Sequence, residues 1–254
     1  MIDIHTHILF GVDDGCETLE ESMELLGDAC NEGITDIICT PHALHPQYNV
    51  TIEQVTNKLA LLSENIEKKG LSIRLHPGQE IRLCEDLVEK VLNREVLTLA
   101  NSKYLLLELP SHTIPSYIIN IIQSLVSIDI VPIIAHPERN RAIAENPQRL
   151  EKLIRHGAIS QITAGSVAGH FGKNIQKLSL KLISTNLVHT YGSDAHNSST
   201  RPLLFDKGLA ILEKKKMFDH IDVILENNER IIKNEPLFML EPEVIGAKKL
   251  FGIW

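Results

Sequence analysis

The sequence lacks any apolar run approaching the roughly 18 residues that a membrane-spanning helix needs. Its first five residues have neither the basic segment nor the apolar segment of a secretory signal peptide. Its four cysteines show no C-x-x-C spacing, and free thiols are typical of a reducing compartment. We therefore expect a soluble, cytoplasmic protein that is not inserted in a membrane.

The chain also lacks an excess of positive charge. Its 25 lysines and arginines stand against 33 acidic residues, which gives a formal net charge of −8. Binding of a polynucleotide depends on basic surface, so this balance disfavours nucleic acid as a partner. The 254 residues contain no Gly/Ser-rich linker and no shift in composition, which favours a single domain spanning residues 1–254.

Seven short runs of β-forming residues alternate with helical patterns. The runs are mostly apolar, as is typical of strands covered on both faces of a sheet. Capping signals at Thr18 and Thr51, together with glycines such as Gly70, mark the starts and ends of the helices between them. The predicted strands are 2–5, 35–40, 72–76, 103–109, 131–135, 158–163 and 188–192.

A steady alternation of strand and helix predicts a parallel sheet in an α/β fold. Seven such units without a linker favour a closed or nearly closed barrel of the TIM type, a (β/α)7 barrel. An open doubly wound sheet is the alternative. The pattern weakens after about Glu229, and we expect the tail from about residue 240 to Trp254 to form an extended arm or a contact segment.

Side chains that can bind metal ions stand at or just after six of the seven predicted strands. A β/α barrel builds its active site from the C-terminal ends of its strands, so these side chains are expected to meet there. A ninth candidate, Asp14, lies just beyond the first strand in an Asp-Asp-Gly turn. In strand order the other eight are His5, His7, His42, Glu80, Glu108, His136, Asp194 and His196.

A single His-x-His pair is more often part of a satisfied core than a metal site. Here a second pair, Asp194 and His196, ends the last strand and would lie beside the first strand in a closed barrel. Glu108 ends an apolar strand, where burial of an unpaired carboxylate costs several kcal/mol unless the group is protonated. The Asp13-Asp14-Gly15 tripeptide by itself reads as an ordinary turn, but its place beyond the first strand lets one aspartate reach an ion while the other points outward.

Five imidazoles and four carboxylates are too many for one ion and suit two or three divalent cations, with zinc, manganese or iron compatible with mixed N and O ligation. Such a concentration of positive charge fits a phosphate monoester, attacked by a metal-bound hydroxide without a covalent enzyme intermediate. Arg139 and Arg201 lie near the same rim and can hold nonbridging phosphate oxygens. A solvated surface ion pair is an equally good interpretation of either arginine alone.

These motifs resemble those of the polymerase and histidinol phosphatase (PHP) superfamily over nearly the whole chain. Within it, the chain looks most like the bacterial manganese-dependent protein-tyrosine phosphatases encoded with capsule and exopolysaccharide genes. The matching motifs are His5-Thr6-His7, Asp13-Asp14-Gly15, Thr40-Pro41-His42, Gly78-Gln79-Glu80-Ile81-Arg82, Ala135-His136-Pro137-Glu138-Arg139-Asn140, Ser193-Asp194-Ala195-His196, Arg201-Pro202 and Lys249-Leu250-Phe251-Gly252.

The resemblance implies a distorted seven-stranded barrel with a trinuclear site, in which manganese is favoured over iron or zinc. It implies that the substrate is the phosphotyrosine tail of a membrane-associated bacterial tyrosine kinase that controls capsular or exopolysaccharide synthesis. The nine candidate ligands match the family pattern, and Arg139 and Arg201 match its phosphate-binding arginines. The resemblance leaves the oligomeric state open.

Three other functions compete with this one. A small-molecule PHP phosphatase, acting for example on histidinol phosphate, would share the metal ligands and differ in the surrounding loops. A proofreading exonuclease is disfavoured by the acidic balance and the single-domain length. A metal-stabilised scaffold that only docks on the kinase would have closed ion shells with no exchangeable water.

Overall fold

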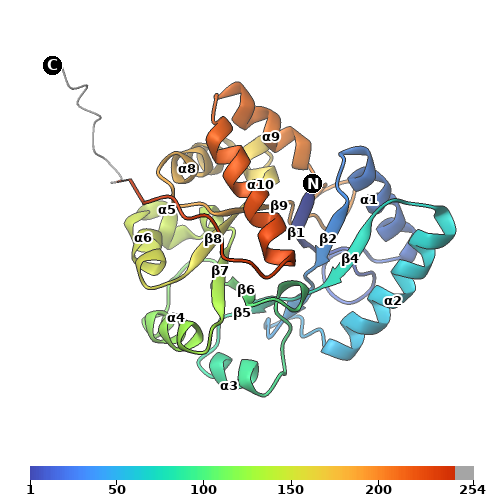
Figure 1. Ribbon diagram of the computed structural model, residues 1–254, viewed down its shortest axis with the longest axis horizontal. Helices are drawn as coiled ribbons and strands as arrows, with labels where there is room; N and C mark the ends of the chain where they lie inside the picture. Colours follow the sequence, from blue (N-terminus) through green and yellow to red (C-terminus); the bar gives the residue numbers. More distant parts are fainter. Residues whose placement is uncertain (244–254) are drawn as a thin grey trace.

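The computed structural model describes residues 1–243, in which parallel strands lie at the centre and helices pack around them (Figure 1). Residues 244–254, which make up most of the tail for which we expected an arm or contact segment, lie outside the described residues. The strands are β1 (Ile2–Thr6), β2 (Asp36–Cys39), β3 (His42–Ala43), β4 (Arg74–Pro77), β5 (Glu80–Arg82), β6 (Tyr104–Glu108), β7 (Val131–Ala135), β8 (Ile159–Thr163) and β9 (Thr190–Gly192).

Helices connect most of these strands and surround them in Figure 1. Two short 3-10 turns, η1 (Leu99–Asn101) and η2 (Pro137–Arg139), lie beside β6 and β8. The α-helices in the described residues are α1 (Leu19–Asn31), α2 (Ile52–Lys69), α3 (Leu87–Leu92), α4 (Ile118–Ser127), α5 (Arg141–Glu145), α6 (Gln148–Arg155), α7 (Ala164–Ala168), α8 (Lys173–Ser184), α9 (Phe205–Lys214) and α10 (Phe218–Ile232).

All seven predicted strands are present, and the structure adds the two short strands β3 and β5. Each added strand follows a predicted one after two residues, so that β2 and β3 form one interrupted run, as do β4 and β5. All pairings are parallel, with the order β1-β2-β4 in one sheet and β3-β5-β6-β7-β8-β9 in the other. The two interrupted runs thereby link the sheets into one curled wall.

The curled wall brings its first and last strands together. Thr6 and Ala195 form a parallel bridge, and two backbone hydrogen bonds flank it, from the Asp194 N–H to the His5 carbonyl at 2.7 Å and from the His7 N–H to the Ala195 carbonyl at 2.9 Å. The prediction of a distorted β/α barrel is confirmed in this form, and the open doubly wound sheet is wrong.

Helix α10 strengthens the same junction from the other end of the strands. The buried Asn228 side chain donates to the carbonyl of Ile2 in β1 at 2.8 Å and to the carbonyl of Tyr191 in β9 at 2.7 Å. Its amide oxygen accepts a hydrogen bond from the Tyr191 N–H at 3.2 Å. One side chain therefore satisfies three backbone groups of the first and last strands.

Apolar side chains fill both faces of the strands, as predicted from the near-continuous apolar runs. In β6, Leu105 and Leu107 belong to the large cluster that packs against the helices, whereas Tyr104 and Leu106 belong to a smaller cluster. This alternation follows the two-residue period of a strand. The smaller cluster takes members from β1, β2, β6, β7 and β8, so it fills the space that these strands enclose.

The helix signals predicted at Thr18, Thr51 and Gly70 are present, but the capping box at Thr18 is only half formed. Thr51 and Gln54 form a complete capping box at α2, which ends at Gly70 with a left-handed φ of 65°. Thr18 accepts from the Glu21 N–H at α1, but the Glu21 carboxylate accepts from Glu17 instead of returning to Thr18. The local signals therefore fix where α1 and α2 begin.

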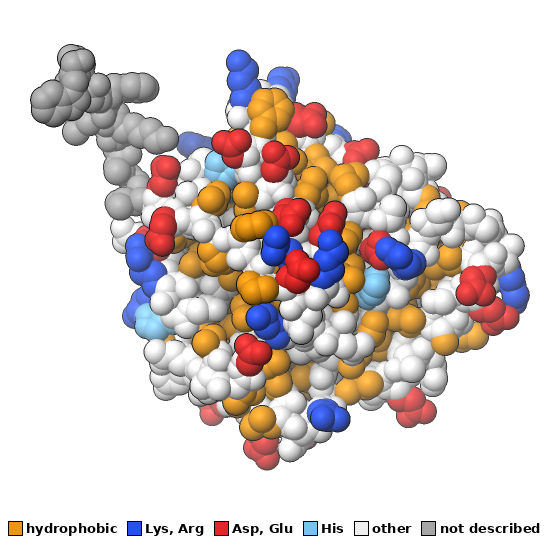
Figure 2. Space-filling model, in the orientation of Figure 1, with side chains coloured by type: hydrophobic (Ala, Val, Ile, Leu, Met, Phe, Trp, Pro, Cys, Tyr) orange, Lys and Arg blue, Asp and Glu red, His pale blue; other side chains and the backbone are white. Residues whose placement is uncertain are grey.

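The surface over α10 carries acidic and basic side chains intermixed (Figure 2). Ion pairs along α10 contribute to this pattern, including Arg230 with Glu226 at 3.1 Å and Lys233 with Glu229 at 3.2 Å. Pairs of this exposed kind contribute little to stability, about 0.3–0.5 kcal/mol each. Among the described helices, none combines the length and the apolar composition that a bilayer span requires.

We predict that Asn228→Ala destabilises the protein by about 2–4 kcal/mol, because it leaves buried backbone groups of β1 and β9 without partners. Urea unfolding followed by circular dichroism measures the change. Asn65→Ala is the matched control, since Asn65 bonds only its own helix at a partly exposed position. A loss of stability in Asn228→Ala no greater than in the control would contradict this role in closing the barrel.

Candidate metal centre

All nine side chains predicted as metal ligands converge at the C-terminal ends of the strands. They form four groups in which the donor atoms lie within 4.8 Å of one another. Several residues belong to two groups, as bridging ligands between neighbouring ions would. The groups are His7, Asp14, His42 and His196; His5, His7 and Glu80; His5, His136 and Asp194; and His42, Glu80 and Glu108.

The imidazole of His5 is oriented by a buried glutamine from β8. Gln161 donates through Nε2 to the carbonyl of Ile162 at 2.7 Å, which fixes its amide so that Oε1 faces Nδ1 of His5 at 2.9 Å. Since an amide oxygen only accepts, Nδ1 carries the hydrogen and Nε2 is left with its lone pair towards the cluster. Hydrogen bonds of this kind hold metal-binding histidines in the required tautomer.

Asp13 has the same role for His7, which corrects our expectation that one aspartate of the Asp-Asp-Gly turn points outward. Its buried carboxylate accepts from Nδ1 of His7 at 2.8 Å and from the backbone N–H groups of His42 and Gly15, both at 3.0 Å. A Cβ on Gly15 would lie 2.0 Å from the His7 carbonyl oxygen, so the turn requires glycine. Asp14 is the aspartate that faces the ligand cluster.

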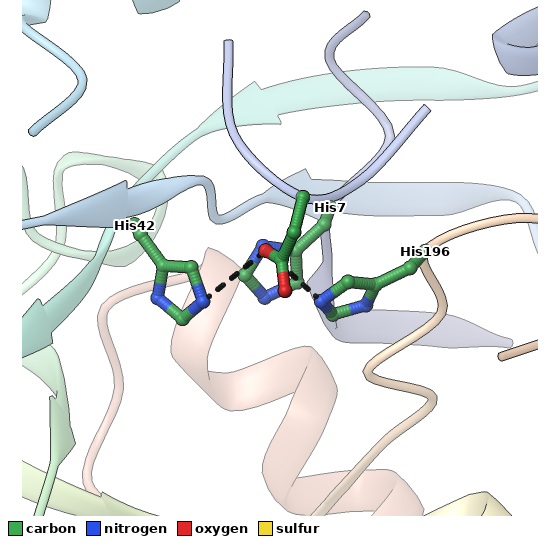
Figure 3. Close-up of side chains that lie close together, drawn as sticks. His7, His42 and His196 are labelled. Carbon is green, nitrogen blue, oxygen red and sulfur yellow. Dashed lines mark ion pairs between the residues drawn. The ribbon is translucent and has the colours of Figure 1, made fainter. Parts of the chain in front are cut away.

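Asp14 lies between two histidines from distant parts of the chain. Figure 3 shows His7, His42 and His196 pointing towards one another, with dashed lines marking the ion pairs. Oδ1 of Asp14 is 3.4 Å from Nε2 of His42 and 3.5 Å from Nε2 of His196. The Asp14 side chain is 37% exposed, so this end of the cluster is open to solvent.

Glu80 lies at the centre of the cluster. Its Oε2 is 3.5 Å from His5, 3.3 Å from His7 and 3.1 Å from His42, and its Oε1 is 2.7 Å from His136. Burial acts to raise the pKa of Glu80, but the surrounding imidazoles hold it well below its usual range. A carboxylate ringed by four imidazoles in this way is suited to bridging cations.

Asp194 is the second central carboxylate. Its Oδ1 lies 3.3 Å from Nε2 of His5 and 3.4 Å from Nε2 of His7, while its Oδ2 accepts hydrogen bonds from Arg139 and Arg201. Burial acts to raise the pKa of Asp194, but the two guanidinium groups hold it well below its usual range. Oδ1 thus faces the imidazoles, and Oδ2 faces the two arginines.

Glu108 is paired on one side only. Arg82 donates to its Oε1 at 2.9 Å, and its Oε2 is buried without a hydrogen-bond partner. Arg82 stands two residues beyond Glu80 at the end of β5 and was not among the predicted site residues, although it belongs to the Gly78–Arg82 motif. Glu108 also contributes an oxygen to the donor group that it forms with His42 and Glu80.

Four ligand atoms of the cluster are buried without a hydrogen-bond partner: Glu80 Oε2, Asp194 Oδ1, Glu108 Oε2 and His42 Nδ1. Buried polar atoms are almost always satisfied, so four exceptions in one place need a physical explanation. Divalent cations supply it, because the unpaired atoms are carboxylate oxygens and an imidazole nitrogen, which are good ligands for zinc, manganese or iron. The residues present therefore fit a group of bound cations.

The pKa shifts within the cluster run in opposite directions. Burial acts to lower the pKa of His7, but Asp13 raises it well above its usual value, whereas burial lowers the pKa of His196 to about 4. Burial and the charge of Glu80 together raise the pKa of Glu108. Bound cations would favour unprotonated imidazoles and ionised carboxylates throughout, which removes this conflict.

The two arginines that we predicted to bind phosphate were expected on the rim of the site. They lie closer to the predicted ligands than that. Both donate to Oδ2 of Asp194, and Arg201 also approaches Oδ2 of Asp14 to 3.6 Å. The guanidinium of Arg139 lies over the ring of Phe171, 5.3 Å from its centroid. Both arginines therefore border the cluster and the pocket in front of it.

A pocket of about 330 Å³ opens in front of the cluster and is lined by most of its ligands and by both arginines. Residues that we had not assigned to the site complete it, notably Tyr48 and Asn140. His45 also lines the pocket; its closeness to His42 in the sequence had left this open as the alternative to a structural or surface role. Neither Asp13 nor Gln161 could be identified as orienting residues from sequence, because their roles depend on contacts between separate strands and loops.

We predict that Gln161→Leu weakens metal binding about 10- to 100-fold, because His5 loses the acceptor that fixes its tautomer. Gln161→Glu keeps an acceptor at this position and should bind metal more tightly than Gln161→Leu. Titration of the chelator-stripped protein with manganese, followed by calorimetry, measures both. Equal affinities in the wild type and Gln161→Leu would show that Gln161 does not orient His5.

Comparison with known proteins identifies the same fold and family. The family model described as capsular polysaccharide synthesis, CpsB/CapC, matches residues 1–233. CapC of Staphylococcus aureus is 43% identical, and the tyrosine-protein phosphatase YwqE of Bacillus subtilis is 38% identical, each over the full length of both chains. The tyrosine-protein phosphatase CpsB of Streptococcus pneumoniae is 32% identical, covering 85% of this chain and 90% of that protein.

Solved structures agree with the sequence relatives. A crystal structure from a study of YwqE and CpsB, described there as unique metal-dependent tyrosine phosphatases, superposes with a TM-score of 0.94 at 38% identity and covers 97% of this chain and all of that one. The phosphotriesterase homology protein of Escherichia coli has a TM-score of 0.55 at 11% identity, covering 91% of this chain and 97% of that one. That second likeness extends to the fold alone.

Proposed function

The chain belongs to the CpsB/CapC family of capsular polysaccharide synthesis, and from this we infer that it is a metal-dependent tyrosine-protein phosphatase. The observation that carries the assignment is the convergence of nine imidazole and carboxylate ligands from positions 5 to 196 beside two arginines. A site of this composition suits hydrolysis of a phosphate ester. One domain supplies all of these groups.

We propose that the site holds three divalent cations, with manganese favoured over iron and zinc. Four overlapping groups of donors support more than one ion, since they share His5, His7, His42 and Glu80. The ligands are nitrogen and oxygen without thiolate, which suits all three metals. When bound, such cations lower the pKa of coordinated water and neutralise developing charge on phosphate.

Arg139 and Arg201 would bind the nonbridging phosphate oxygens. Their guanidinium groups already donate to Oδ2 of Asp194, so both point to the place where a second anion would approach the cluster. Planar guanidinium groups bind phosphate through paired hydrogen bonds, and these strengthen as charge develops in the transition state. The arginines thereby position the phosphorus for attack by water.

The cysteines do not fit the role of a nucleophile that would form a covalent intermediate. Cys16 contacts the carbonyl of His196, but burial raises its pKa to about 11. Burial also raises the pKa of Cys84 to about 12. A thiol attacks as its thiolate, so direct hydrolysis by water is the better mechanism for this chain.

The proposed physiological substrate is the phosphotyrosine tail of a membrane-associated bacterial tyrosine kinase that controls capsular or exopolysaccharide synthesis. Tyrosine-protein phosphatases in the same family support this choice. We place the reaction in the cytoplasm, where the four free cysteines would remain reduced. An exposed tail can enter the open side of the pocket beside Asp14.

We predict that His136→Ala and Glu108→Ala each lose bound metal and nearly all turnover of a phosphotyrosine peptide. Arg139→Ala should keep its metal and lose about 10²- to 10³-fold in kcat, because it removes a donor that stabilises transition-state charge. Arg141→Ala is the control, since this exposed arginine pairs with Glu145. Metal analysis beside steady-state kinetics separates the roles, and equal metal loss in all three site variants would contradict them.

We predict that the manganese-loaded enzyme hydrolyses a phosphotyrosine peptide faster than histidinol phosphate, and that a chelator abolishes both reactions. The two substrates separate a tyrosine phosphatase from a small-molecule phosphatase with the same ligands. Faster turnover of histidinol phosphate would make the small-molecule assignment correct. Turnover that survives complete removal of metal would overturn the proposed chemistry.

A further inference from the structure

Three near-parallel rings are stacked against one another at one side of the pocket. The ring centroids of His42 and His45 are 4.8 Å apart, those of His45 and Tyr48 are 5.7 Å apart, and those of His42 and Tyr48 are 5.9 Å apart. Their planes lie within 22° of parallel in every pair. We call His42, His45 and Tyr48 the ring wall, which leads from the ligand cluster into the pocket.

The loop that carries the ring wall is fastened to the ligand cluster. It leaves β3 after Ala43 and returns to His42, whose carbonyl accepts a hydrogen bond from the Val50 N–H at 3.0 Å. Within the loop, Leu44 takes a left-handed φ of 57° and its N–H donates to Oδ1 of Asn49 at 2.9 Å. Gln79 donates to the Val50 carbonyl at 2.6 Å. The wall therefore has a defined position relative to the cluster.

His45 and Tyr48 have no role in the metal centre as described so far. Neither belongs to any of the four donor groups in the described residues. Both are partly exposed and line the same pocket as Arg139 and Arg201. Aromatic side chains that only support His42 would be expected to bury their faces, whereas these two border open space in front of the cluster.

The ring wall and the arginines offer two different surfaces to a ligand. The arginines and the ligand cluster suit the anionic phosphate. The ring wall instead offers the flat surface of aromatic rings, including the uncharged side chain of Tyr48. Aromatic rings stack in offset arrangements with centroids about 4.5–7 Å apart, which is the spacing already present within the wall. A planar group joined to the phosphate can continue that arrangement, and an alkyl group cannot.

We propose that His45 and Tyr48 bind the aromatic ring of the substrate and so give the site its preference for aryl over alkyl phosphates. This inference rests on the proposed function and names the residues that select phosphotyrosine at the same site. The phosphate is held beside Arg139 and Arg201, and the ring of the leaving group lies against the wall. His42 joins the two parts, because it belongs to both the wall and the donor groups.

Calorimetry with phenylphosphonate and methylphosphonate tests the proposal, because neither compound is hydrolysed. The manganese-loaded wild type should bind phenylphosphonate about tenfold more tightly than methylphosphonate. In Tyr48→Ala the ratio should fall to about twofold, with the affinity for methylphosphonate unchanged. Tyr48→Phe should restore the wild-type ratio, because it keeps the ring. His45→Ala provides an independent second variant and should also lower the ratio.

Gln47→Ala is the matched control, since Gln47 stands in the same loop and has no ring. Metal analysis of every variant accompanies the titrations. Equal affinities of the wild type for the two phosphonates would overturn the proposal, as would loss of metal or of methylphosphonate binding in Tyr48→Ala, because the wall would then only support His42. Turnover of a phosphotyrosine peptide is measured separately. A protein that prefers phenylphosphonate without hydrolysing that peptide contradicts the proposed function and leaves the ring preference standing.

Discussion

The junction between β1 and β9 is the constraint on which the site depends. Two backbone hydrogen bonds and the bridge from Thr6 to Ala195 place His5 and His7 beside Asp194 and His196, although about 190 residues separate them in the chain. The Asn228 side chain in α10 holds the same two strands at their other ends. Closure of the barrel therefore also assembles the ligand cluster. A chain in which these two strands did not meet would hold the ligands in two separate, incomplete sets.

Closure of the barrel brings together side chains of like charge, which repel one another. Four carboxylates and five imidazoles meet in a largely buried space, where like charges interact strongly. Arg82, Arg139 and Arg201 offset part of the negative charge, and Asp13 and Gln161 hold the imidazoles in the orientation in which their lone pairs face inward. The fold supplies the stability that such a cluster lacks by itself, and bound cations complete the balance.

The sequence predicted most of the fold and all nine residues that meet in the cluster, for identifiable reasons. Buried parallel strands are continuous apolar runs, and a barrel gathers what stands at their ends, so His136 or Glu108 could be placed from position alone. Contacts between separate elements have no such signal. Asp13 was expected to point outward because only Asp14 of the Asp-Asp-Gly turn was assigned to an ion, and the pairing of Arg82 with Glu108 depends on the register between β5 and β6. The short strands β3 and β5 were also missed, because an apolar pattern alone does not record the breaks that Pro41 and Pro77-Gly78 mark.

The arrangement of the pocket also explains how one scaffold can serve different phosphate esters. Most of the predicted ligands stand at or just after strand ends and are brought together by barrel closure, whereas His45 and Tyr48 stand on a loop that leaves His42 and returns to it. A change in that loop can therefore alter the surface offered to the leaving group while the donors keep their spacing. The phosphate chemistry is common to any occupant of the cluster, and selectivity must come from residues that contact only the ester's organic part. In this chain the ring wall is placed to supply that selectivity.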